Sequence, residues 1–255
     1  MPDPKRNAIS PARGAPEKGE QADTPSADVP SWLRQAAPVR PPRLTPLAPS
    51  AAFAEEIGAA MAGTARDRQM ALQRGQVVHR LMQSLPDIAP MARKPALEHY
   101  LGNADRDLSP DQRAEIARHV FAILEDSRFA EVFAAGSRPE VPIVGRIPRP
   151  NGQPIPVAGQ VDRLIVTNDA VLVVDYKTDR LVPSHVGEVP KAYVAQLALY
   201  CAVLMRIYPD KRVRAGIIFT AAPVLMEIPA AMLDRALETE LDRYGTARYA
   251  PVSAA

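Results

Sequence analysis

Apolar residues recur every three or four positions beyond residue 50, and this spacing predicts amphipathic helices. The predicted helices span residues 66–85, about 91–101 and 110–125. Ser109 and Pro110 are typical of a helix start, as the cap and the first helical residue. Gly75 interrupts the first helix at a cost of about 1 kcal/mol against alanine, which indicates that another segment packs closely there.

Shorter apolar runs follow, and they predict strands over 140–147, 157–166 and 171–178. Turn-forming residues at 167–170 predict that the last two strands form a β-hairpin. The remaining pattern predicts a helix, two strands and a final helix, at 190–208, 213–220, 224–228 and 229–244. Helices followed by interleaved strands and helices indicate an α/β fold, a central mixed β-sheet flanked by helices.

Proline is concentrated at the start of the chain, where residues 1–50 hold 11 of the 27 prolines. Such a segment cannot bury enough apolar surface to offset its ordering entropy. We therefore predict a disordered Pro-rich linker over 1–50 and a folded domain over 51–250. Within the domain, we expect a helical part at about 51–135 and an α/β core at about 136–245.

Composition and charge narrow the classes of function. A single cysteine, Cys201, excludes a disulfide framework and a four-cysteine zinc or iron–sulfur site within one chain, and it fits a cytoplasmic protein. The start of the chain shows no signal peptide, and no run reaches about 18 apolar residues, so we expect no membrane segment. The net charge is +2, and basic and acidic residues are equal in number beyond residue 50. Charge alone therefore does not indicate a nucleic-acid partner.

The predicted hairpin carries the candidate chemistry. If Val166 faces Val171, Asp162 lies opposite Asp175, with Cβ atoms about 4.5–5.5 Å apart. Lys177 points to the same face as Asp175 because side chains alternate along a strand. Two close carboxylates need a cation, and oxygen ligands favour Mg²⁺ or Mn²⁺, which can polarise a phosphoryl oxygen. The alternative is a surface hairpin whose charges pair with their neighbours.

Four short motifs occur in a fixed order around these residues. They read GQVVH at 75–79, GQVDR at 159–163, DYKT at 175–178 and QLALY at 196–200. Together they resemble the motifs of RecB-type nucleases, a branch of the PD-(D/E)XK superfamily. The resemblance covers roughly residues 51–250 and implies a restriction-endonuclease-like core.

The resemblance also implies a role for each matching residue. It implies that His79, Asp162, Asp175 and the carbonyl of Tyr176 hold the metal, that Lys177 is the catalytic lysine, and that Glu140 is the acidic residue of the first strand. Gln196, Tyr200 and Arg163 would contact the substrate or the catalytic strands. Each role has an alternative: a satisfied core or surface histidine at 79, a polar pair at the end of the hairpin, and a solvated arginine.

A looser resemblance concerns the linker. Residues 30–34 and 46–50 are similar to the segment ahead of the nuclease domain in AddA-type helicase–nucleases of double-strand break repair. The two resemblances together imply an Mg²⁺- or Mn²⁺-dependent deoxyribonuclease, an exonuclease of single-stranded DNA. The linker resemblance adds an upstream helicase portion and an AddB-like partner. The chain would be a piece of such a protein or a detached nuclease.

The absence of two motifs restricts which members of the family the chain can resemble. The chain has no GxxxxGK[ST] phosphate loop and hence no predicted ATP site, and its one cysteine excludes the iron–sulfur cluster of AddB-type relatives. Two other classes stay open: a catalytically silent nuclease fold that serves DNA binding or assembly, and a metal-dependent hydrolase of another substrate.

Overall fold

The computed structural model describes residues 35–36, 45–52, 64–103, 108–150 and 152–247. Residues 44–255 form one compact unit, and the fold is that of its described part. Most of the predicted linker, residues 1–50, lies outside the described residues. Among the residues that the structure describes, no helix is both long and apolar enough to cross a bilayer.

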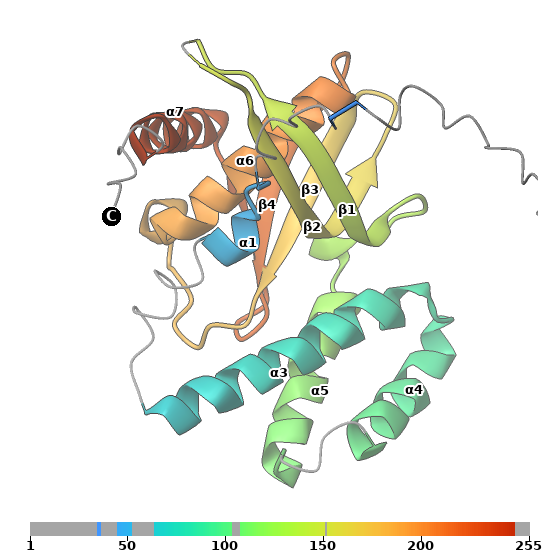
Figure 1. The fold of residues 1–255 in the computed structure, drawn as a ribbon. Coiled ribbons are helices and arrows are strands. Elements are labelled where there is room, and N and C mark those ends of the chain that lie inside the picture. The colour runs from blue at the N-terminus through green and yellow to red at the C-terminus, as the bar shows by residue number, and fades with distance from the viewer. Residues whose placement is uncertain (1–34, 37–44, 53–63, 104–107, 151, 248–255) are drawn as a thin grey trace, which may run out of the picture. The chain divides into compact units, whose positions relative to one another are not determined.

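A five-stranded mixed sheet forms the centre of this unit (Figure 1). The strands lie in the order β1-β2-β3-β4-β5, and all neighbours are antiparallel except β3 and β4, which are parallel. Their bounds are Arg138–Ile147, Ile155–Val166, Ala170–Lys177, Arg212–Phe219 and Val224–Ile228. Helix α6 (Lys191–Ile207) joins the two parallel strands. The predicted central mixed sheet is confirmed.

Hairpin β2–β3 has the predicted register only in the part next to its turn. Val166 pairs with Val171, and the pairing continues to Arg163 opposite Val174. One residue further the strands part, and the Asp162 side chain accepts a hydrogen bond from the backbone N–H of Tyr176 at 2.6 Å. A side chain thus replaces the next backbone partner, and the two strands open at this level.

Three helices cover one face of the sheet, namely α3 (Ala65–Ser84), α4 (Pro90–Asn103) and α5 (Pro110–Leu124). They lie together below the sheet in Figure 1. Their apolar side chains form one core with Ile165, Leu172, Val174, Tyr176 and Ile218 of the sheet. The predicted cap is confirmed: the Ser109 side chain accepts from Gln112 N–H, and the Gln112 side chain accepts from Ser109 N–H.

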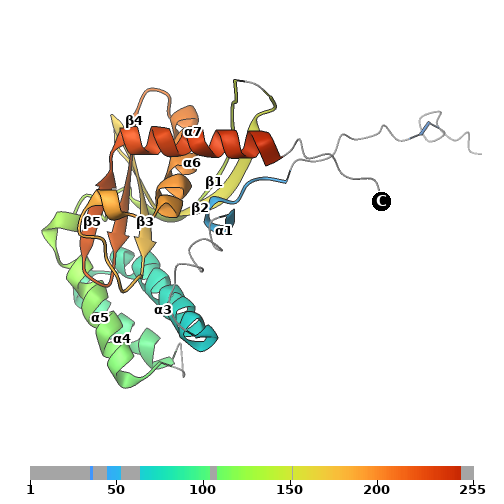
Figure 2. The same cartoon turned by 90° about the vertical axis from the view of Figure 1, so that its left-hand side faces the viewer.

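The opposite face carries α6, which is buried on all sides from Ala192 to Leu204. The sheet packs on one side of this helix, and α7 (Ala230–Ala247) packs beyond it (Figure 2). The short α1 (Pro49–Ala52) also contacts α6. Met205 is 45% exposed, because the cover of α6 ends one residue earlier, at Leu204.

The linker prediction extends too far toward the domain. Leu47 is buried in the α6-side core and forms an isolated parallel bridge with Val157 of β2. Its backbone N–H donates to Pro156 and its carbonyl accepts from Ala158. No strand among the described residues pairs with the N-terminal half of β2 on this side, so residues around Leu47 satisfy its free edge. The folded unit therefore begins before residue 51.

Candidate active site

The strands β1 and β2 are irregular at the level of Glu140 and Asp162. On one side of this level Pro139 pairs with Arg163, and on the other side Val141 pairs with Val161. Between them, Glu140 adopts a φ of 51°. Side-chain alternation also breaks in β2, because Val161 and Leu164 pack in the same core although they are three residues apart. At this level the two acidic side chains lie beside His79 of α3.

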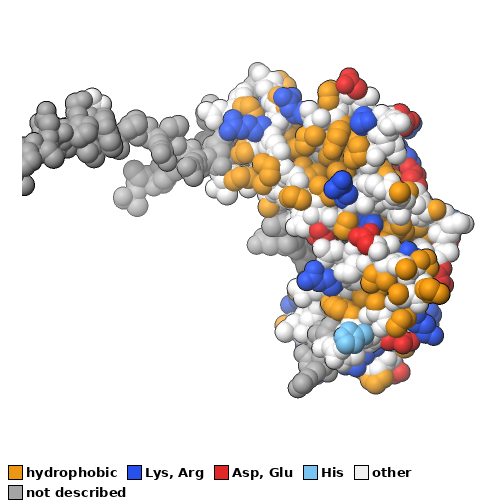
Figure 3. Space-filling model, turned by 90° about the vertical axis from the view of Figure 1, so that its right-hand side faces the viewer, with side chains coloured by type: hydrophobic (Ala, Val, Ile, Leu, Met, Phe, Trp, Pro, Cys, Tyr) orange, Lys and Arg blue, Asp and Glu red, His pale blue; other side chains and the backbone are white. Residues whose placement is uncertain are grey.

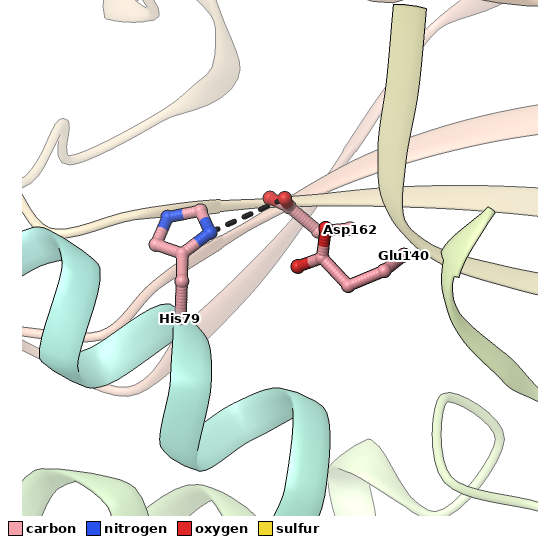
Figure 4. A group of neighbouring side chains, drawn as sticks. All are labelled: His79, Glu140 and Asp162. Atoms are coloured by element: carbon pink, nitrogen blue, oxygen red, sulfur yellow. Dashed lines mark ion pairs between the residues drawn. The ribbon is translucent and has the colours of Figure 1, made fainter. Parts of the chain in front are cut away.

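Helix α3 supplies the third member of a cluster of candidate metal ligands. One ligand atom each of His79, Glu140 and Asp162 lies within 4.8 Å of the other two. His79 Nδ1 is 3.2 Å from Asp162 Oδ1. Figure 4 shows the three side chains converging from a helix and two strands. Helix α3 thus meets strands β1 and β2 at one point, although His79 precedes Glu140 by some sixty residues in the sequence.

The charges in this cluster favour a bound cation. Burial lowers the pKa of His79, but the hydrogen bond and charge of Asp162 oppose it, and the net effect is a pKa above the usual value. Burial and the charge of Asp162 raise the pKa of Glu140. The attraction of His79 to Asp162 and the repulsion between Glu140 and Asp162 both reflect negative charge concentrated in the cluster. Two carboxylates and an imidazole are ligands that divalent ions accept, so the donor set fits such an ion.

Asp175 and Lys177 form a second group, on the α6 side of the sheet. Asp175 Oδ2 lies 2.8 Å from Lys177 Nζ, and Asp175 Oδ1 accepts from Gln196 Nε2 at 2.9 Å. Lys177 Nζ also donates to Gln196 Oε1 at 3.2 Å, which closes a triangle of contacts. Burial raises the pKa of Asp175 against the opposing charge of Lys177. Gln196 therefore fixes both the acid and the lysine.

This arrangement corrects the predicted geometry of the two aspartates. We expected them on one face, but Asp162 meets His79 of α3 while Asp175 meets Gln196 of α6. Since β2 and β3 part between them, both side chains still line the same cleft. Asp175 is not a member of the three-residue cluster. The Tyr176 backbone contributes its N–H to Asp162, and a role for its carbonyl stays a prediction.

The cleft that holds both groups is long and open. It is lined along α3 from Asp67 to Gln83, and on the other side by the segment from Asp175 to Pro183 and by α6. Its volume is about 1390 Å³, whereas one water occupies about 30 Å³. The space is therefore much larger than a site for an ion alone.

Close packing between α3 and the end of β3 holds His79 over the sheet. A Cβ on Gly75 would lie 3.3 Å from Thr178 Oγ1, tighter than most real contacts. The neighbouring Arg74 is buried and donates to the Thr178 carbonyl at 2.9 Å. The close approach that the sequence predicts at Gly75 is therefore confirmed, and it places His79 one turn further along the same helix.

Two predicted substrate contacts do not reach the cleft. Arg163 is 1% exposed, and its guanidinium points into the core between the helices and the sheet. Tyr200 is also 1% exposed, and its hydroxyl donates to the Gln160 carbonyl at 3.0 Å, beside Gly159. The broken alternation in β2 turns Arg163 inward, and α6 is buried at Tyr200. Neither side chain is placed to touch a ligand in the cleft, whereas the other predicted role of Tyr200, contact with a catalytic strand, agrees with its hydrogen bond to β2.

Sequence reasoning missed two residues that hold the site together. The Lys177 ammonium lies 4.1 Å from the ring centre of Tyr193, whose hydroxyl donates to Asp179 at 2.9 Å. Gln160 donates to the Glu140 carboxylate at 2.6 Å. Helical spacing was a usable signal for the first, because Tyr193 lies three residues before Gln196. For Gln160 the usable signal was strand alternation, because it lies two residues before Asp162.

On one face of the molecule, surface charge does not mark out a binding site. On the face shown in Figure 3, acidic and basic side chains are interspersed and do not gather in patches of one sign. This mixture agrees with the balanced charge of the sequence. Cationic groups relevant to a charged substrate are those at the cleft itself, including Arg80, Lys177 and Arg180.

Comparison with known proteins gives the chain's relatives. The family model of the PD-(D/E)XK nuclease superfamily matches residues 49–247. A 65-residue segment, 26% of this chain, is 34% identical to an ATP-dependent helicase/nuclease subunit from Oenococcus oeni, and it spans only 6% of that protein. The solved structure described as "Crystal structure of SSO0001" shares 15% identity, with 73% of this chain and 90% of that chain covered. Its TM-score is 0.30, which is too low to support an argument.

The family match extends over all five strands, the cluster and the Lys177 group. It therefore includes every element that forms the cleft, and the expected restriction-endonuclease-like architecture, a mixed sheet flanked by helices, is confirmed. The chain belongs to the PD-(D/E)XK nuclease superfamily.

Proposed function

We propose that this domain is a divalent-metal-dependent deoxyribonuclease that hydrolyses phosphodiester bonds of single-stranded DNA. The observation that carries the proposal is the cluster of His79, Glu140 and Asp162 beside the Asp175–Lys177 pair in one cleft. A structural ion-pair network could also place acids together. It would not explain why the group favours added positive charge next to an oriented lysine.

In the proposed mechanism, His79, Glu140 and Asp162 hold Mg²⁺ or Mn²⁺. The ion would supply Lewis acidity and a lowered pKa for water. Lys177 projects its ammonium, fixed by Asp175 and Gln196, toward the phosphate and stabilises its developing negative charge. Asp175 as a further ligand is part of the proposal, since its charge interacts with that of Asp162.

The lining of the cleft supports an unpaired strand as substrate. The lining along α3 from Asp67 to Gln83 corresponds to about 24 Å at 1.5 Å per residue, enough for several nucleotides. Arg180 and the 91%-exposed Leu181 lie on the other wall, and the 65%-exposed Leu72 lies on α3. Apolar side chains next to arginines suit a strand whose bases are free to contact the protein while its phosphates meet cations.

The cellular setting that we propose is double-strand break repair and recombination. Two observations support a role as the nuclease part of an AddA-like helicase–nuclease: the partial match to a helicase/nuclease protein, and the AddA-like linker motifs. In that setting an upstream helicase portion would deliver the strand, and an AddB-like protein would be the partner. The RecB/AddA-type assignment rests on these two observations.

Cleavage of defined substrates tests the proposal. The protein is incubated with a linear single strand, the matching duplex and the matching RNA in Mn²⁺ or Mg²⁺, with and without EDTA. We expect degradation of the single DNA strand, complete loss of degradation with EDTA, and a loss of about 10²-fold or more in Asp162→Ala and Lys177→Ala.

A matched control is available at the turn of the same hairpin. Lys211→Ala removes a lysine that binds the carbonyls of Thr167 and Asn168, away from the cleft, and it should cut at the wild-type rate. Cleavage by the Asp162 and Lys177 variants at the wild-type rate would contradict the assigned site. Metal-independent DNA binding without any cleavage would instead favour the silent module.

A further inference from the structure

We propose that Arg163 is a positioning residue that sets the spacing of the three candidate metal ligands. This inference rests on the proposed function, because it assumes that His79, Glu140 and Asp162 bind a metal. It assigns Arg163 a role that does not require contact with DNA, in agreement with its 1% exposure.

The guanidinium contacts the segments that carry two of the ligands, and Arg163 directly follows the third ligand in the chain. Arg163 Nε donates to Ser137 Oγ at 2.7 Å, and Ser137 lies three residues before Glu140. Arg163 Nη1 reaches the Met82 carbonyl at 3.5 Å, and Met82 lies three residues after His79. Asp162 is its neighbour in the chain. One planar group therefore spans the helix and both strands, a geometry that suits the fixed fork of arginine donors.

Stability alone does not account for an arginine at this position. The only carboxylate within ion-pair distance in the described residues is that of Asp87, at 3.6 Å and 63% exposed. The guanidinium also lies 5.2 Å from the Phe133 ring centre. A buried cation whose one ion-pair partner among the described residues is distant and solvated is costly compared with an apolar side chain of similar size. The links between segments are therefore the better explanation.

The link to Ser137 also bears on the strained backbone at Glu140. A non-glycine residue at φ 51° persists only where its surroundings hold it. Ser137 Oγ accepts from Arg163 and donates to the Val132 carbonyl at 2.6 Å, which fixes the chain just before β1. Arg163 thus restrains the segment that presents Glu140 to the cluster.

Direct measurement of Mn²⁺ affinity tests the inference without relying on cleavage. The dissociation constant is measured by electron paramagnetic resonance of free Mn²⁺, on full chains and below the unfolding temperature of each variant. We expect Arg163→Lys, which keeps the charge but loses the fork, to weaken Mn²⁺ binding by about tenfold or more. Ser137→Ala, a milder change, should weaken it by about threefold.

Arg214→Lys is the control for lost stability. Arg214 makes ion pairs to Glu131 and Glu227 and does not line the cleft, so this variant should lose stability and keep the wild-type Mn²⁺ affinity. An unchanged affinity in folded Arg163→Lys overturns the inference. If that variant does not fold, an unchanged affinity in Ser137→Ala overturns it, and so does an equal loss in Arg214→Lys.

The proposed function fails in a different way. If wild-type protein binds no Mn²⁺, or if Asp162→Asn binds it as well as wild type, the metal site itself is wrong and the inference falls with it. If wild type binds, Asp162→Asn does not and Arg163→Lys is unaffected, the inference alone is wrong.

Discussion

The backbone of Glu140 adopts a conformation that costs a residue with a side chain about 1–2 kcal/mol. The same residue carries a carboxylate whose pKa is raised by burial and by the charge of Asp162. Asp175 is buried nearby with a raised pKa of its own. Unfavourable features thus concentrate at a few residues, as expected where function and not stability fixes the local structure.

Replacing Glu140 separates strain from chemistry. Glu140→Gly and Glu140→Ala both remove the carboxylate, so we expect both to lose metal-dependent cleavage. Glycine tolerates positive φ, and the Gly variant should therefore be more stable than the Ala variant by about 1 kcal/mol. Urea denaturation of the two variants measures the difference. Equal stabilities would show that the position is not strained.

Motif order was sufficient to identify His79, Asp162, Asp175 and Lys177 as residues of one cleft. It did not give the direction of their side chains. A strict two-residue alternation places Asp162 and Asp175 on one face, and the irregular backbone at Glu140 and Asp162 breaks that rule. The same break sends Arg163 into the core. Such irregularities arise from contacts between distant segments, which a local pattern does not contain.

At the scale of elements, α6 packs unusually close to β1. A Cβ added to Gly145 would lie 2.5 Å from Val203 Cγ1, so only glycine fits without movement. The helix is buried along most of its length between the sheet and α7. This contact fixes the layer that carries Gln196 and Tyr193.

Gly145→Ala should destabilise the protein by about 1–3 kcal/mol through overpacking. Val203→Ala removes the methyl groups in the way, so the double variant should lose less stability than the sum of the two single variants. A coupling of about 1 kcal/mol in thermal or chemical unfolding would confirm the close approach. Strictly additive losses would contradict it.

The position at which the folded unit begins can also be tested at the scale of elements. Leu47 is 8% exposed and bridges β2, although composition assigned it to the linker. Leu47→Ala should cost about 2–3 kcal/mol of unfolding free energy, whereas Thr45→Ala, at an exposed neighbour, should cost almost nothing. Equal, small effects in chemical denaturation would place Leu47 outside the folded unit.

Periodicity predicted all the longer helices and the strands to within a few residues, because the apolar residues of each element pack into one of the two cores. The boundary near residue 47 was missed since one leucine in a Pro-rich segment has no period to reveal it. Met205 shows the opposite case: the helical pattern continues past the point where the covering elements end, and the side chain is exposed.

At the scale of the compact unit, two apolar cores lie on opposite faces of one sheet, and the cleft opens where β2 and β3 part between them. His79 comes from one side and Gln196 from the other. The site therefore depends on both layers being docked on the sheet, which explains why its motifs are spread over more than a hundred residues.

Low pH should weaken the ion pair between Arg214 of β4 and Glu227 of β5. The Arg214 guanidinium holds the pKa of Glu227 below its usual value of 4.5. A depressed folded-state pKa contributes stability above the unfolded-state pKa, and this is lost as the pH falls through the folded-state value. Because the Glu227 side chain is 45% exposed, we expect less than about 1 kcal/mol. The stability difference between wild type and Glu227→Gln should shrink from pH 7 to pH 3, and a constant difference would contradict the assignment.

The most direct test of the metal site is a crystal structure of the protein with Mn²⁺, with the ion located from its anomalous scattering. We expect a peak about 2 Å from a ligand atom of each of His79, Glu140 and Asp162, with Lys177 facing the same cavity. A peak elsewhere in the cleft, or bound Mn²⁺ that leaves these three side chains unligated, would contradict the assigned metal site.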